Sequence, residues 1–141
     1  MKGFIIISLA MAGFSALLDP ITLDDLKWEK RILLIFQSEH EPPFQLTLDD
    51  GLKQEITDRD LIYFVFGDSI FSNSNYTFEG AYAEKIKKLY RQGAKSSCYV
   101  LLGKDGGSKL RKEGENLDWE ELFATIDAMP MRRQEMKNNL E

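Results

Sequence analysis

Three short apolar segments constrain the fold of this chain more than any other feature. They are residues 31–37, whose five inner positions are all apolar, residues 61–66 and residues 98–102. An uninterrupted apolar run of this length indicates a strand that is buried on both faces, as the central strands of parallel sheets are. We therefore expect these segments to form the middle of a sheet that other elements cover on both sides.

The segments between these runs predict helices and one further strand. The helices expected from apolar spacing and breaker residues are residues 46–57, 81–92, 117–128 and 132–140, and residues 21–30 are expected to form a short helix or a turn. Asp105-Gly106 is typical of a hairpin turn, so residues 108–112 are expected to return as a fourth strand, whereas the polar residues 67–79 predict a loop. The order β-α-β, then α-β-β-α, predicts an α/β, thioredoxin-like fold with a central mixed four-stranded sheet and helices on both faces.

The first residues resemble an export signal. Lys2 supplies a basic start, and Gly3 to Leu18 contain no charged residue. This pattern predicts a signal peptide over residues 1–16 and a mature domain over residues 17–141 that is periplasmic or extracellular. A buried helix or a membrane anchor is the alternative, but the run is shorter than the roughly 20 residues that span a bilayer. No later segment is apolar enough to span, so we expect no stable membrane span after cleavage.

Charge and cysteine content exclude several classes of protein. Removal of Lys2 with the signal reduces the 18 basic residues to 17, against 23 acidic ones. An acidic domain is a poor candidate for binding nucleic acid, whose affinity for proteins comes mainly from neutralised phosphates. The single cysteine, Cys98, allows no internal disulfide, so the domain must depend on its apolar core.

Four segments resemble a known family. They are KWEKR at residues 27–31, DRDL at 58–61, LGKDGG at 102–107 and IDAMPMRRQEM at 126–136. Together they are similar to the domain of unknown function 4174 family of small exported bacterial proteins. A related domain occurs in sushi-repeat-containing and coiled-coil-containing extracellular proteins of animals. The resemblance implies a thioredoxin-like fold and an exported location, and it implies no established activity.

The position of Cys98 argues against thiol chemistry. A thioredoxin-type thiol stands at the helix N-terminus after the first core strand, where the helix dipole stabilises thiolate. Residues 37–44 occupy that place and contain no cysteine, and Lys95-Ser96-Ser97 stands where such enzymes carry a proline. Cys98 therefore predicts a buried core thiol. The alternative is a peroxiredoxin-like or thioredoxin-like redox enzyme that uses Cys98.

Candidate binding residues lie in four places along the sequence. Glu39, His40 and Glu41 follow the first core strand, but a lone histidine without further ligands argues against a metal site. Arg59 precedes the second core strand and favours a structural charge pair, and Lys104 lies in a glycine-rich turn that lacks the Walker pattern. The terminal helix carries Arg132, Arg133 and Glu135. We predict no catalytic residue, no metal and no cofactor.

These observations favour an exported, non-catalytic domain that binds a protein or another envelope component. The expected contact surface is the loop at residues 38–44, joined by the terminal helix if the fold brings the two together. Binding of an anion or metabolite near Lys104 or Arg132 is a further possibility.

Overall fold

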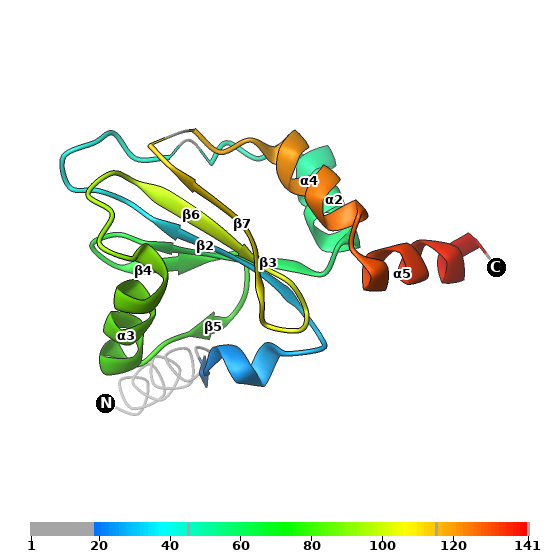
Figure 1. The fold of residues 1–141 in the computed structure, drawn as a ribbon, viewed down its shortest axis with the longest axis horizontal. Coiled ribbons are helices and arrows are strands. Elements are labelled where there is room, and N and C mark those ends of the chain that lie inside the picture. The colour runs from blue at the N-terminus through cyan, green and yellow to red at the C-terminus, as the bar shows by residue number, and fades with distance from the viewer. Residues whose placement is uncertain (1–18, 45, 115, 141) are drawn as a thin grey trace, which may run out of the picture.

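The three apolar runs form the centre of one mixed sheet, as predicted (Figure 1). The computed structural model describes residues 19–44, 46–114 and 116–140. Strand β2 (Arg31–Phe36) pairs in parallel with β3 (Leu61–Phe66) and antiparallel with β6 (Cys98–Leu102). Strand β7 (Ser108–Glu113) returns antiparallel beside β6, after a turn in which Gly106 has a φ of 85°. Every residue of β2, β3 and β6 is buried, which explains their unbroken apolar sequence.

The sheet has five strands, so the prediction of four is wrong. Strand β4 (Ile70–Ser72) lies in the predicted loop, where it folds back and pairs antiparallel with β3. The side chain of Asn73 extends this pairing, because it accepts from Tyr63 N (3.0 Å) and donates to Leu61 O (3.2 Å). Apolar periodicity does not register such a strand, since it has only three residues and the contacts that extend it come from a polar side chain. The strand order is β4-β3-β2-β6-β7.

Helices cover both faces of the sheet, as predicted. They are α2 (Asp50–Asp58), α3 (Gly80–Arg91), α4 (Trp119–Asp127) and α5 (Pro130–Leu140). Alternate residues of β2 point to opposite faces, so Leu34 belongs to the core that contains Ile86 of α3. Leu33 belongs to the opposite core, with Ile56 of α2 and Leu122 of α4. Figure 1 accordingly shows α3 on one side of the sheet and α2 with α4 on the other.

Two aspartates set where the helices on one face begin. Asp49 accepts a hydrogen bond from Leu52 N (2.7 Å) and caps α2, and Asp118 accepts from Glu121 N (3.1 Å) and caps α4. The Asp-rich start of α2 therefore ends the preceding loop rather than interrupting a longer helix.

The segment before β2 forms a turn, which is one of the two forms expected of it. It forms only the 3-10 turn η1 (Leu23–Leu26), preceded by the short strand β1 (Asp19–Pro20), which pairs with β5 (Tyr76–Thr77). Trp28 follows η1 with a φ of 69° and is 63% exposed.

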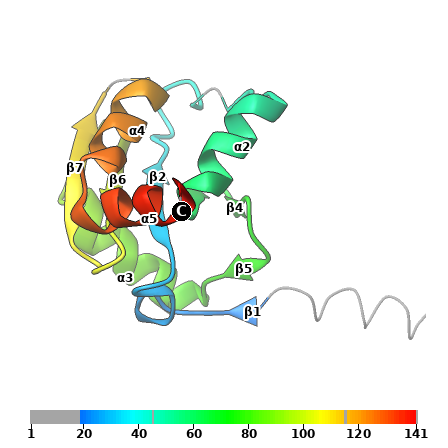
Figure 2. The ribbon, with the colours of Figure 1, turned by 90° about the vertical axis from the view of Figure 1, so that its right-hand side faces the viewer.

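Helix α5 projects from the body of the domain. It extends away from the sheet in Figure 1 and runs toward the viewer in Figure 2. Arg132 is its only buried residue, so polar contacts at its base must hold it. No helix among the described residues is long and apolar enough to cross a bilayer. The signal peptide predicted for residues 1–16 lies outside the described residues.

Candidate functional site

The loop that follows the carboxyl end of β2 is pinned to the start of β6. Ser38 N donates to Ser97 Oγ (2.8 Å), and Ser97 N donates to Glu41 Oε2 (3.1 Å). Glu41 is therefore engaged in holding the loop, whereas Glu39 and His40 are exposed. Of the three predicted binding residues in this loop, Glu39 and His40 are the two that are exposed.

A cavity of about 380 Å³ adjoins this loop. Its lining includes His40 and three basic residues, Lys87, Arg91 and Lys95. Arg91 Nε donates to Ala94 O (2.8 Å), so this guanidinium closes the turn after α3. Among the described residues, no group of three or more histidine, cysteine, aspartate or glutamate side chains is placed to hold a metal ion.

Cys98 is the first residue of the inner strand β6, at the end of the sheet that faces this loop, and its exposed fraction is 0%. It pairs with Phe36 of β2 on one side and Glu113 of β7 on the other. Burial raises the pKa of the thiol, and the nearby charges of Arg111 and Arg91 offset this only in part. A buried thiol with a raised pKa is a poor nucleophile.

At the opposite end of β2, a cluster of charged side chains joins α5 to the sheet. Arg31 donates to both carboxylate oxygens of Glu135, through Nη1 (3.1 Å) and Nη2 (3.2 Å). Lys104 Nζ lies 2.6 Å from Glu135 Oε1 and 2.9 Å from Asp60 Oδ2. Arg31 also donates to Arg59 O (2.9 Å), so the first residues of β2 and β3 are tied to one helix.

A second set of ion pairs lies beside the first. Asp127, the last residue of α4, accepts from Arg59 Nη2 (2.8 Å) and from Arg132 Nε (3.0 Å). Arg132 Nη2 also donates to Asp58 Oδ2 (2.8 Å), and the guanidinium of Arg59 lies 4.3 Å from the centroid of the Phe123 ring. These contacts fix the angle between α4 and α5 and close the end of α2.

The two central carboxylates of these clusters are ionised. Burial on its own would raise the pKa of Glu135, but the hydrogen bonds and charges of Lys104 and Arg31 outweigh it and lower the pKa. Burial likewise opposes ionisation of Asp127, and Arg59 and Arg132 outweigh it, so the pKa of Asp127 is also lowered. The charges of the clusters therefore neutralise one another.

The fold separates the predicted site residues into two groups. Lys104, Glu135, Arg59 and Arg132 lie together at the amino end of β2, whereas the loop at residues 38–44 follows its carboxyl end. Six residues of strand separate the two groups by about 20 Å. The loop and the terminal helix therefore do not form one surface. Arg133, also on α5, is exposed and has no ion pair in the described part of the chain.

Three residues central to these clusters were not singled out from the sequence. They are Arg31, Asp60 and Asp127. The sequence did contain one signal, since Arg31 directly precedes five consecutive apolar residues. An arginine that is buried with such a strand requires a carboxylate partner. Its partner, Glu135, lies 104 residues along the chain, beyond any local pattern.

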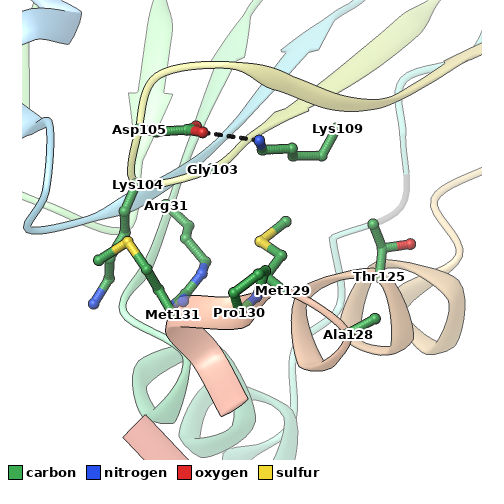
Figure 3. A pocket seen from close by; sticks show the side chains of 10 residues that line it. All are labelled: Arg31, Gly103, Lys104, Asp105, Lys109, Thr125, Ala128, Met129, Pro130 and Met131. Carbon is green, nitrogen blue, oxygen red and sulfur yellow. Dashed lines mark hydrogen bonds and ion pairs between the residues drawn. The ribbon is translucent and has the colours of Figure 1, made fainter. Parts of the chain in front are cut away.

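A cleft of about 340 Å³ opens beside the first cluster, between the β6–β7 turn and the junction of α4 with α5 (Figure 3). Ala128, Met129, Pro130 and Met131 form its apolar wall. The charged residues of its lining are Arg31, Lys104, Asp105 and Lys109. Asp105 and Lys109 pair with each other at 3.0 Å, as the dashed line in Figure 3 marks.

The four segments that carry the family resemblance meet around this cleft and its ion pairs. They supply Arg31, Asp60, Lys104 and Glu135, which bond to one another although they are distant in sequence. Residues 22–135 match the family described as Domain of unknown function (DUF4174). No curated protein and no solved structure matches the chain. Since the match covers most of the sequence and every residue of both ion clusters, the chain belongs to the DUF4174 family.

Proposed function

We propose that this chain is an exported, non-catalytic thioredoxin-like domain that binds another protein or another component of the cell envelope. The observation that carries the proposal is the complete burial of Cys98, the only cysteine of the sequence. Without an accessible thiol, the corner at which thioredoxin-type enzymes react has no nucleophile. The features of this domain that another molecule can reach are its surface and its cavities.

The sheet order supports the thioredoxin-like part of the proposal. Strands β3-β2-β6-β7 are neighbours, with the first pair parallel and the later pairs antiparallel. Helices α2 and α4 share one face and α3 covers the other, and β4 is an addition at the edge. A crystal structure whose backbone superposes on thioredoxins over these seven elements would support the assignment, and a different connectivity would refute it.

The surface around α5 is the better candidate for recognition. The ion clusters hold the helix in a fixed position, so the cleft beside it is formed before any partner arrives, and preformed sites bind with a smaller entropic cost. Met131 borders the cleft and is 40% exposed. The loop at residues 38–44 offers a less apolar cavity whose bordering loop is held by Glu41.

An affinity experiment tests the binding proposal. The full chain, tagged at its C-terminus and produced in its native cells, is recovered after mild cross-linking of the envelope fraction. We expect a small and reproducible set of proteins or envelope components whose yield falls for Met131→Glu. The matched control is Gln134→Glu, which adds the same charge to an exposed position of α5. Recovery of nothing reproducible by the unmodified chain would overturn the proposal.

Alkylation of Cys98 tests the redox alternative. Native protein at neutral pH is expected to react with iodoacetamide at least about 100-fold more slowly than the same chain in denaturant, because the thiol is sealed between strands. Equal rates in the two conditions would restore the thiol-enzyme hypothesis.

Export rests on the sequence of residues 1–16 alone. Fractionation of cells and N-terminal sequencing of the mature protein test it. We expect the protein outside the cytoplasm, with a new N-terminus near residue 17. An intact Met1 on a cytoplasmic protein would remove export from the proposal and leave the binding function to be judged by itself.

A further inference from the structure

The charges that line the cleft beside α5 are already balanced. Arg31 and Lys104 share the carboxylate of Glu135, Lys104 also pairs with Asp60, and Lys109 pairs with Asp105. A carboxylate or phosphate that entered the cleft would have to compete with these partners. The three basic side chains of the lining therefore do not favour an anionic ligand, because each already has a carboxylate partner.

One hydrogen-bond donor in the lining has no acceptor. The side chain of Arg31 is 1% exposed, and its two terminal nitrogens bond to Glu135 and to the carbonyl of Arg59. Its Nε is buried and has no hydrogen-bond partner among the described residues. Buried donors are almost always satisfied, because an unsatisfied one is costly. What the site lacks is a single oxygen acceptor without a charge.

The walls on either side of this donor are apolar and adaptable. Figure 3 draws the side chain of Arg31 between those of Met129 and Met131, and Pro130 lies beside them. Methionine side chains are unbranched and shift at little cost, so these two can make room for a group that approaches Arg31. A cleft of about 340 Å³ accommodates one large aliphatic or aromatic side chain with its flanking backbone.

We propose that this cleft binds a peptide segment of a partner protein. One large apolar side chain of that segment lies between Met129 and Met131, and a backbone carbonyl beside it accepts from Arg31 Nε. An amide carbonyl supplies an oxygen without adding charge, which is the combination that the balanced lining and the single free donor require. The inference rests on the proposed binding function and names the class of partner and the part of it that is recognised.

Methyl NMR with a defined probe tests this inference. The full chain is labelled at its methionine methyl groups and titrated with N-acetyl-L-leucine N-methylamide up to about 20 mM, since a ligand of this size is expected to bind near 1 mM. We expect the signals of Met129 and Met131 to shift and saturate, and that of Met136, elsewhere on α5, to stay unchanged. Added salt should alter the affinity little.

Two related probes separate the competing explanations. N-acetylglycine N-methylamide lacks the apolar side chain and should cause no saturable shift. N-acetyl-L-leucine carries a carboxylate instead of the second amide and should bind no more tightly. Tighter, salt-dependent binding of that carboxylate would replace the peptide site by an anion site. The absence of shifts with all three probes, or equal shifts of Met136, would overturn the proposal, and the free donor would then be satisfied by water.

Variants assign the contacts. Met131→Ser changes a partly exposed residue and should weaken the leucine probe at least about 5-fold, whereas Met136→Ser removes the same side chain outside the cleft and should not. Arg31→Lys removes the Nε donor and should weaken binding similarly in protein that still shields Cys98 from alkylation. Unchanged binding by both cleft variants would refute the assignment.

The envelope experiment with Met131→Glu distinguishes this inference from the proposed binding function. If the unmodified chain recovers partners from the envelope and Met131→Glu recovers them equally well, the binding function stands and the cleft is not its site. If the unmodified chain recovers none, the binding function fails, and with it the identification of a protein partner.

Discussion

Replacement of Glu135 by glutamine should destabilise the domain far more than its place on a projecting helix suggests. The substitution keeps the size of the side chain and removes its charge. Arg31, 1% exposed, then loses the one carboxylate partner that it has among the described residues, while Lys104 keeps Asp60. The variant therefore leaves a buried guanidinium without a counter-charge at the first residue of the central strand.

The size of the effect follows from burial. Removal of one partner from a fully buried ion pair costs about 3–5 kcal/mol. The side chain of Glu135 is 26% exposed, and the glutamine oxygen still accepts from Arg31, so both solvent and the new amide reduce the loss. We expect the free energy of unfolding to fall by about 2–3 kcal/mol, which lowers the melting temperature of a domain of this size by roughly 10 °C.

Urea unfolding at pH 7, followed by circular dichroism, measures this loss. The matched control is Glu84→Gln, because Glu84 pairs with Lys87 at 3.1 Å but is 73% exposed. Exposed pairs contribute about 1 kcal/mol or less, so the control should stay near wild type. A loss for Glu135→Gln no larger than that of the control would refute the reasoning, and the bond between Arg31 and α5 would then be dispensable. Full replacement of the pair by apolar residues should recover part of the loss.

Three further measurements follow from the structure. The pKa values of Glu135 and Asp127 are lowered in the folded state, so their contribution to stability is complete above the unfolded-state pKa, near 4, and is lost as the pH falls below it. The free energy of unfolding should therefore be level above about pH 5 and decline from about pH 4. A decline that begins near pH 6 would contradict this. Trp28 has a φ of 69°, so Trp28→Gly should be more stable than Trp28→Ala by about 1 kcal/mol in thermal unfolding, and equal stability would show that the turn carries no strain. Asn73→Leu should remove both hydrogen bonds to β3 and speed amide exchange at Tyr63 by at least about 5-fold, whereas protection equal to wild type would show that β4 holds the edge without the Asn73 side chain.

The central strands were predictable because burial on both faces favours an apolar residue at almost every position of a strand. Residues 61–66 and 98–102 match β3 and β6 residue for residue. Strand β4 was not predictable by the same means, since it has three residues and its pairing continues through the side chain of Asn73. The segment before β2 was expected to form a short helix or a turn; it forms the 3-10 turn η1, after which Trp28 N donates to Lys104 O (2.7 Å).

The site was harder to predict than the fold, for a physical reason. Ligand sites in open α/β sheets usually lie beyond the carboxyl ends of the strands, which favoured the loop at residues 38–44. The structure instead places most charged candidates at the amino end of β2. Arg59 was expected to form a charge pair, but neither its partner Asp127 nor the partners of Lys104, Arg132 and Glu135 could be named without the fold. A buried cluster of opposite charges is built from distant segments, and no local pattern in sequence records it.

The arrangement at the amino end of β2 links stability to recognition through one side chain. Arg31 holds Glu135 of α5 with its two terminal nitrogens, its side chain lines the cleft, and its buried Nε has no partner among the described residues. Loss of the Glu135 charge would weaken this hold, and the donor proposed to meet a partner would be less firmly oriented. The buried arginine at this position is therefore better explained by the orientation that it gives to its own donors than by stability. An apolar pair of similar volume would hold α5 at least as well.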